Sequence, residues 1–215
     1  MRAAPDTATL RPPPLSFETI ENAEALPPQI GVTAPRSVPD ALYARLFGQP
    51  APAADDLTHP AGTRVPLPLM QTYALLDAAK VANLAEMIAC SGLEHRCLFT
   101  GATAGELSDV APWLVRLEAE SRFTRRLFTA GRMPGALWDK RPGVFLRSRA
   151  GFQPLWAYLR KFTRVRDETG KWFYFRFWEP AFAAVAQEII SQAGAGPARD
   201  AGYPVTVIAL QPKGI

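Results

Sequence analysis

The chain has 215 residues, of which 48% are hydrophobic and 20% are charged, and its formal net charge is +4. These proportions are those of a globular protein with one domain or one domain plus extensions, and they argue against global disorder. No stretch reaches the roughly 20 uncharged apolar residues that span a bilayer, and the first residues lack a signal-peptide core, so we expect no membrane and a cytoplasmic location. Cys90 and Cys97 are too few for a disulfide framework.

The prolines are concentrated in the first third of the chain. Of the 21 prolines, 13 lie within residues 1–70. Proline fixes φ and has no N–H to donate, so such a segment runs extended or as turns. We therefore predict a proline-rich N-terminal arm over residues 1–66. Within it, residues 37–47 have the apolar spacing of a short helix that docks on the body, with Asp40 as its cap.

The remaining residues predict an α/β body over 67–193 and a C-terminal tail over 194–215. Short apolar runs indicate strands, and apolar spacings near 3.6 residues indicate helices. The predicted fold is a mixed sheet of about five to six strands flanked by helices, with the proline-rich extension before it. The predicted strands are 73–79, 96–100, 113–117, 144–148 and, in the tail, 205–210; the predicted helices are 83–90, one capped by Ser121, one with Pro154 at its first position, and 181–191 after Pro180.

The most informative segment is residues 171–178, which a turn at 167–170 joins to residues 164–166 in a predicted hairpin. Aromatic side chains alternate onto both faces of this strand, with Arg176 among them, so neither face suits water. A strand that is covered on both sides belongs in the middle of an α/β sheet. A lone buried arginine is costly, so we expect Arg176 to pair with Asp77 or Glu179, or to stack on an indole ring.

Charge is also unevenly distributed. Residues 116–176 contain 15 Lys or Arg and 5 Asp or Glu, a net charge of +10, whereas the rest of the chain has a net charge of −6. This polarity indicates an acidic partner or self-association, and we predict a basic, partner-facing patch at Arg122, Arg125 and Arg126. Nucleic-acid binding stays open as the alternative, although no recognition signature accompanies the basic residues that would contact phosphates: Arg122, Arg125, Arg126, Arg147, Arg149, Lys161, Arg164 and Arg166.

The candidate catalytic and metal-ligating residues form no recognisable motif. Cys90, His95 and Cys97 are close in sequence, but a zinc site usually needs four ligands, and the only other imidazole belongs to His59. The carboxylates, Asp77 among them, form no paired motif, and the sequence has no phosphate-binding loop or HExxH signature. We therefore predict no metal and no cofactor, and an enzyme that depends on Cys97 or Asp77 stays open as an alternative.

Three segments, in this order, resemble a known family: the type VI secretion effector chaperones or adaptors, catalogued as domain of unknown function 4123. They are YALLDAA at 73–79, CLFTG at 97–101 with APWLVRL at 111–117, and FQPLWAYLRKFTRVRDETGKWFYFRFWEP at 152–180. The last segment is similar to the family's Arg-Phe-Tyr-Asp-Pro signature, since Trp178-Glu179-Pro180 keeps a ring and a carboxylate. Ala111 stands where the family has glycine.

The resemblance implies a loading factor that is not an enzyme. Such proteins bind a cognate toxin effector in the cytoplasm and help to place it on the secretion spike, so the implied partners are a toxin and the spike protein. Trp156 and Arg160, four residues apart on one predicted helix, join the three arginines of the basic patch as predicted protein-binding residues. The implied structural anchors are Asp77, Pro112, Trp113, Phe175, Arg176, Phe177, Glu179 and Pro180.

Overall fold

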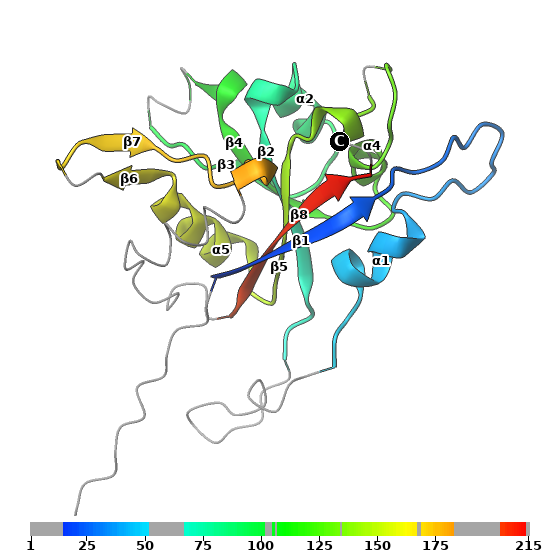
Figure 1. Cartoon of the computed structure of the whole chain (residues 1–215), viewed down its shortest axis with the longest axis horizontal. Helices are drawn as coiled ribbons and strands as arrows, with labels where there is room; N and C mark the ends of the chain where they lie inside the picture. The colour runs from blue at the N-terminus through cyan, green and yellow to red at the C-terminus, as the bar shows by residue number, and fades with distance from the viewer. Residues whose placement is uncertain are drawn as a thin grey trace, which may run out of the picture.

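The computed structural model of the chain describes residues 15–51, 67–101, 105, 107–133, 135–166, 169–182 and 203–213 (Figure 1). These residues form a six-stranded sheet, the main sheet, in the order β1-β8-β5-β2-β4-β3, and a separate two-stranded ribbon. The predicted α/β fold with a mixed sheet is confirmed, because β1 and β8 are parallel and the other pairs are antiparallel. The strands of the main sheet are β1 (Leu15–Ala23), β2 (Gln71–Asp77), β3 (His95–Cys97), β4 (Pro112–Leu117), β5 (Gly143–Ser148) and β8 (Val205–Pro212).

Strand β2 lies at the centre of the main sheet, between β4 and β5, and its side chains separate the two cores. Successive side chains of a strand point to opposite faces. Tyr73 and Leu75 therefore belong to one core, with α5 (Phe152–Leu159), whereas Ala74 and Leu76 belong to the other. A strand buried on both faces reads as a nearly continuous apolar run, which is the pattern that made this strand recognisable in the sequence.

Helices cover both faces of the main sheet. Helix α5 and the 3-10 helix η5 (Arg160–Phe162) lie on one face, and α1 (Asp40–Phe47), α2 (Leu84–Ala89) and α4 (Arg122–Leu127) lie on the other (Figure 1). The predicted cap at Ser121 is confirmed, since its side chain accepts a hydrogen bond from the Phe123 N–H at 3.2 Å. Short 3-10 helices complete the chain: η2 (Ala78–Lys80), η3 (Ser108–Val110), η4 (Trp138–Lys140) and η6 (Pro180–Phe182).

The segment predicted as an N-terminal arm contributes an edge strand and a helix to this fold. Strand β1 pairs in parallel with β8, so a strand from the N-terminal segment and a strand from the C-terminal segment lie side by side at one edge of the main sheet (Figure 1). Helix α1 docks on the body through Leu42 and Leu46, as predicted. Asp40 does not cap it: the helix begins at Asp40, its N-cap is Pro39, and the Asp40 carboxylate pairs with Arg36 instead.

Two further boundaries differ from the prediction. Helix α5 begins at Phe152, so Pro154 occupies the third helical position and not the first. Backbone N–H groups in the first turn have no acceptor within the helix, so a proline there costs no hydrogen bond. After Pro180 the structure describes only η6, and most of the predicted helix 181–191 lies outside the described residues. Strand β8 confirms the strand predicted at 205–210.

The hydroxyl of Tyr73 fixes the turn after β5. It is fully buried and donates a hydrogen bond to the Ala150 carbonyl at 2.6 Å. Burial raises the pKa of Tyr73 to about 12, so the phenol stays protonated.

We expect Tyr73→Phe to lower the free energy of unfolding by about 1 kcal/mol, measured by urea titration, because the Ala150 carbonyl loses its donor. The exposed Tyr174→Phe is the matched control and should leave stability unchanged; equal losses in both variants would contradict this role.

Candidate functional site

A buried carboxylate joins the end of β2 to the motif at residues 176–180. The Asp77 side chain is 1% exposed and accepts three hydrogen bonds: from the Ala79 N–H at 2.9 Å, from Trp178 Nε1 at 2.9 Å and from the Arg176 guanidinium. The predicted pairing of Arg176 with Asp77 is therefore confirmed, while the Arg176 side chain itself is half exposed. Because the carboxylate is paired and fully hydrogen-bonded, its burial is tolerated.

The second carboxylate of the motif extends this connection. Glu179 accepts from Lys80 Nζ at 2.5 Å and lies 3.8 Å from the Arg176 guanidinium, and Lys80 also donates to the Arg141 carbonyl at 3.1 Å. Phe177 and Trp178 are buried beneath these pairs. We call Asp77, Lys80, Arg176, Trp178 and Glu179 the motif lock, because together they fix the chain after the hairpin to the end of the main sheet.

The other predicted anchors lie close to the motif lock or pack in the core. Pro112 is buried and pairs with Asp77 across β4 and β2. The half-buried ring of Trp113 packs on His95, with ring centroids 6.0 Å apart, and Phe175 packs against Phe177. Pro180 lines a pocket that is described below. These residues hold elements of the chain together and present little surface to a partner.

The hairpin formed by β6 (Arg164–Arg166) and β7 (Trp172–Tyr174) has the most exposed aromatic surface in the described part of the chain. Its two strands are antiparallel and form a ribbon that extends away from the main sheet beside α5 (Figure 1). Trp172, Phe173 and Tyr174 are 56%, 44% and 55% exposed. We call residues 164–166 and 172–174 the aromatic ribbon.

This arrangement corrects the prediction for residues 171–178. The hairpin exists, but its second strand ends at Tyr174 and pairs with β6 alone in the described residues, so it is not a covered strand of the main sheet. The aromatic run is divided: its first three rings are exposed, and Phe177 and Trp178 become buried only after the chain leaves the strand. Alternation shows that a strand has apolar faces but does not show what covers them.

Arginine side chains lie over the exposed rings. Cross-strand pairing places Arg164 opposite Tyr174 and Arg166 opposite Trp172. The Arg164 guanidinium lies 5.6 Å from the Trp172 ring centroid and 5.7 Å from that of Tyr174, and the Arg166 guanidinium lies 5.8 Å from Trp172. Cation–π attraction of this kind contributes about 0.5–1 kcal/mol at an exposed site, so it orders the face without covering it.

Trp156 and Arg160 lie on the same side of the molecule but face inward. Trp156 is 5% exposed; its ring lies between the guanidinium groups of Arg96 and Arg160, at 3.8 and 4.6 Å, and its Nε1 donates to the Cys97 carbonyl at 2.8 Å. Arg160 Nε donates to the Leu98 carbonyl at 3.1 Å. Trp156 therefore attaches α5 to β3, Arg160 attaches η5 to the residue that follows β3, and the Trp156 ring is covered by its own chain.

The structure does not bring the five predicted protein-binding residues together. Arg122, Arg125 and Arg126 lie on α4, whose buried side chains belong to the core on the opposite face of the main sheet from α5. Arg122 and Arg126 are exposed, and Arg125 is half-buried. The prediction missed Trp172, Phe173 and Tyr174 as surface residues; the signal was the Arg-Val-Arg strand facing them across a short turn.

Two arginines counted for the nucleic-acid alternative are buried. Arg147 and Arg149 are 7% and 8% exposed. Arg147 donates to the Leu46 and Gly48 carbonyls and to Thr72 Oγ1, and Arg149 donates to the Pro68 carbonyl at 2.6 Å. These side chains serve the fold and are not available to phosphates.

The cysteines and histidine that invited a metal interpretation are not clustered into a site. Within the described ranges, no group of three or more His, Cys, Asp or Glu side chains could hold a metal ion. His95 Nδ1 is 2.7 Å from the Leu93 carbonyl, and burial raises the pKa of the Cys97 thiol, which makes it a poorer nucleophile. Among the helices that the structure describes, none is long and apolar enough to cross a membrane.

Comparison with known proteins identifies the family. A search of the curated proteins and of the solved structures finds no match. The family described as "Domain of unknown function (DUF4123)" matches residues 72–195, which is more than half of the chain and includes β2, the aromatic ribbon and the motif lock. The chain therefore belongs to the DUF4123 family.

Proposed function

We propose that this protein is a chaperone or adaptor for a secreted effector: it binds a cognate type VI secretion toxin in the cytoplasm and helps to load it onto the secretion spike. The proposal comes from the family resemblance of the three segments quoted above, and it assigns no catalytic residue, metal or cofactor to the chain. Its partners are the toxin and, at loading, the spike protein.

The aromatic ribbon is the observation that supports this proposal best. Contiguous exposed apolar surface on a soluble domain marks interaction sites, and tryptophan, tyrosine and arginine are the residues that dominate binding energy at protein interfaces. The ribbon presents all three types on a two-stranded projection. Rings that arginines already orient lose little side-chain freedom when a partner covers them.

The motif lock supports the same function by fixing the ribbon to the body. Phe175 N–H donates to the Thr163 carbonyl at 3.0 Å just beyond the paired residues of the ribbon, and the lock follows from Arg176 onward. Tyr174 also packs on Phe99, with ring centroids 5.5 Å apart. An isolated two-stranded hairpin is at best marginally stable, so these contacts keep the binding surface formed before cargo arrives.

Removing the exposed rings is expected to abolish most cargo capture without unfolding the chain. We expect Trp172→Ala with Tyr174→Ala to weaken cargo binding at least about 30-fold, which corresponds to roughly 2 kcal/mol lost at an interface hot spot. The measurement is co-expression with the toxin encoded beside this chain, followed by affinity capture, mass spectrometry and calorimetric titration of the purified pair.

The matched control is Tyr43→Ala, which removes an aromatic ring that is 46% exposed on α1. That variant should bind cargo like the wild type. Every variant should still unfold cooperatively, the double ribbon variant slightly below the wild-type melting temperature because it loses the packing of Tyr174 on Phe99. Wild-type affinity in the double ribbon variant would refute the ribbon as the cargo site.

Nucleic-acid binding remains the second candidate, because the aromatic ribbon also combines arginines with rings on which bases can stack. This function requires a steep fall in affinity for generic single-stranded DNA or RNA as salt increases. Tight, salt-dependent binding of such an oligonucleotide, together with no captured toxin, would favour this alternative over the chaperone.

A further inference from the structure

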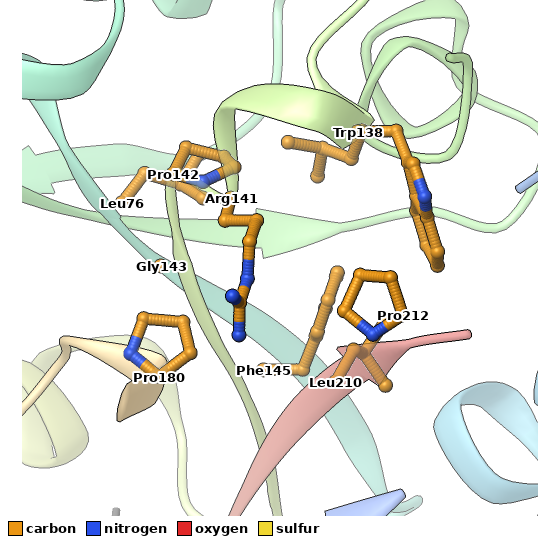
Figure 2. Close-up of a pocket in the computed structure, with 10 residues that line it drawn as sticks. Leu76, Trp138, Arg141, Pro142, Gly143, Phe145, Pro180, Leu210 and Pro212 are labelled. Atoms are coloured by element: carbon orange, nitrogen blue, oxygen red, sulfur yellow. The ribbon is translucent and has the colours of Figure 1, made fainter. Parts of the chain in front are cut away.

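A pocket at the end of the main sheet contains an arginine that forms no ion pair with the described acidic residues. The pocket opens to solvent, and β2, β5, β8, α4, η4 and η6 contribute to its wall. Figure 2 shows the Arg141 side chain reaching into it, between Pro180 on one side and Trp138 and Pro212 on the other. The remaining walls are largely apolar and include Leu76 and Phe145.

The Arg141 guanidinium has no carboxylate partner among the described residues. Its Nε is buried and has no hydrogen-bond partner, and Arg141 forms no ion pair with the described acidic residues. The acidic groups on the neighbouring segments are engaged elsewhere: Glu179 binds Lys80, and the Asp139 carboxylate accepts from the Gly131 N–H at 2.8 Å. The Arg141 side chain is half-buried, so its guanidinium is only partly hydrated and keeps N–H donors that a carboxylate can use.

The backbone conformation of Arg141 also indicates a binding site. Arg141 has a left-handed conformation, φ 45° and ψ 59°, at the C-terminal end of η4, a position where glycine or asparagine would be less strained. An arginine here is therefore disfavoured by its backbone conformation. Strain of this kind is typical of binding sites.

The surroundings of the pocket favour a negatively charged occupant. The Leu137 N–H donates to the Arg126 carbonyl at 2.9 Å, and the Trp138 N–H donates to the Thr129 carbonyl at 3.1 Å, so η4 is attached to the end of α4. Helix α4 carries the predicted basic patch, and its arginines form no ion pair within the described residues. The patch thus borders the pocket and adds to its positive potential.

We propose that this pocket binds a carboxylate carried next to an apolar side chain in the cargo polypeptide, with Arg141 as the carboxylate ligand and the leucine, proline and aromatic walls as the apolar subsite. A guanidinium binds a carboxylate through two parallel hydrogen bonds, which a neutral or purely apolar group cannot replace. The inference rests on the proposed function for the source of the peptide, and it adds a second contact surface on the face of the main sheet opposite α5.

The pocket can be tested without the cargo by titrating three small probes and following the indole N–H resonance of Trp138, assigned with Trp138→Phe. N-acetyl-leucine carries both groups, N-acetyl-leucinamide lacks the carboxylate, and acetate lacks the apolar side chain. We expect weak but saturable binding of N-acetyl-leucine, with a dissociation constant on the order of a few millimolar. The other two probes should bind at least about tenfold more weakly, because the amide loses roughly one charge-assisted contact and acetate loses the apolar contacts.

Variants of Arg141 supply the controls. Arg141→Gln should bind N-acetyl-leucine and its amide equally weakly, and Arg141→Lys should recover part of the difference. Arg141→Gly should melt at or above the wild-type temperature while losing the probe. Equal binding of the acid and the amide by the wild type, or no saturable shift with any probe, would overturn the proposal.

Cargo capture separates this inference from the proposed function. If the chain binds the probe but captures no toxin, then the pocket proposal stands and the chaperone proposal is wrong. If the Arg141→Gln variant captures the toxin as well as the wild type does, and the wild type binds none of the probes, then the pocket proposal is wrong and the chaperone proposal stands.

Discussion

An Asp77→Ala variant is expected to lose about 3 kcal/mol of its free energy of unfolding, because the buried carboxylate satisfies three donors at once. Its removal leaves the Trp178 Nε1–H and the Ala79 N–H without acceptors inside the protein. It also leaves Arg176 without its closest anion, although this arginine is half exposed and can be partly hydrated. The measurement is chemical denaturation followed by tryptophan fluorescence.

Three further variants separate the charge from the hydrogen bonds. Asp77→Asn keeps an acceptor oxygen and should lose less, and Arg176→Ala should lose about 1–3 kcal/mol because it strands a buried carboxylate that keeps two donors. Asp139→Ala, on an exposed carboxylate, should cost less than about 1 kcal/mol. Cargo binding should fall with Arg176→Ala because the ribbon is less firmly held, and wild-type melting of that variant would disprove this link.

An Arg147→Ala variant is expected to be destabilised to a similar extent and to release α1. The side chain is 7% exposed, donates to Thr72 Oγ1 at 2.7 Å, and donates to the Leu46 and Gly48 carbonyls at the C-terminal end of α1. Burial lowers the pKa of Arg147 to about 10, so it is still protonated at neutral pH and complements the helix dipole. We expect a loss of about 3 kcal/mol, since buried acceptors are left unpaired and a cavity forms.

The location of the effect distinguishes this role from general destabilisation. Hydrogen exchange should accelerate first over residues 40–47, because Arg147 attaches that helix to β5. Arg147→Met fills the volume and should recover part of the stability. Arg116→Ala, which removes a half-exposed partner of Glu94 at 3.0 Å, should be nearly neutral. Uniform acceleration across the main sheet, with α1 no faster than the rest, would contradict the docking role.

The sequence predicted those parts of the fold that are encoded by local patterns. Strands β2, β4 and β5 are short apolar runs, and the Ser121 cap is a local hydrogen bond, so each is readable without knowledge of the partner segments. Strand β1 was not predicted, because its pairing with β8 joins residues about 190 positions apart and its half-exposed edge has a weak apolar pattern. Proline content described this segment as extended, which is true of a strand as well as of an arm.

The candidate site was predictable in part for the same reason. An aspartate at the end of an apolar strand and an arginine in an aromatic run each need a partner, and this requirement alone predicted the contact between Asp77 and Arg176. The exposure of Trp172, Phe173 and Tyr174 could not be predicted, since it depends on which strands pair. The Arg141 pocket could not be predicted either, because six elements that are distant in sequence contribute its walls.

The most direct test of the proposed function is hydrogen–deuterium exchange of the chain alone and in complex with the proposed toxin cargo. We expect a stable complex in which residues 164–166 and 172–174 become protected on binding, with smaller protection around Arg141. Protection confined to other surfaces, with the ribbon still exchanging at its free rate, would contradict the proposed function.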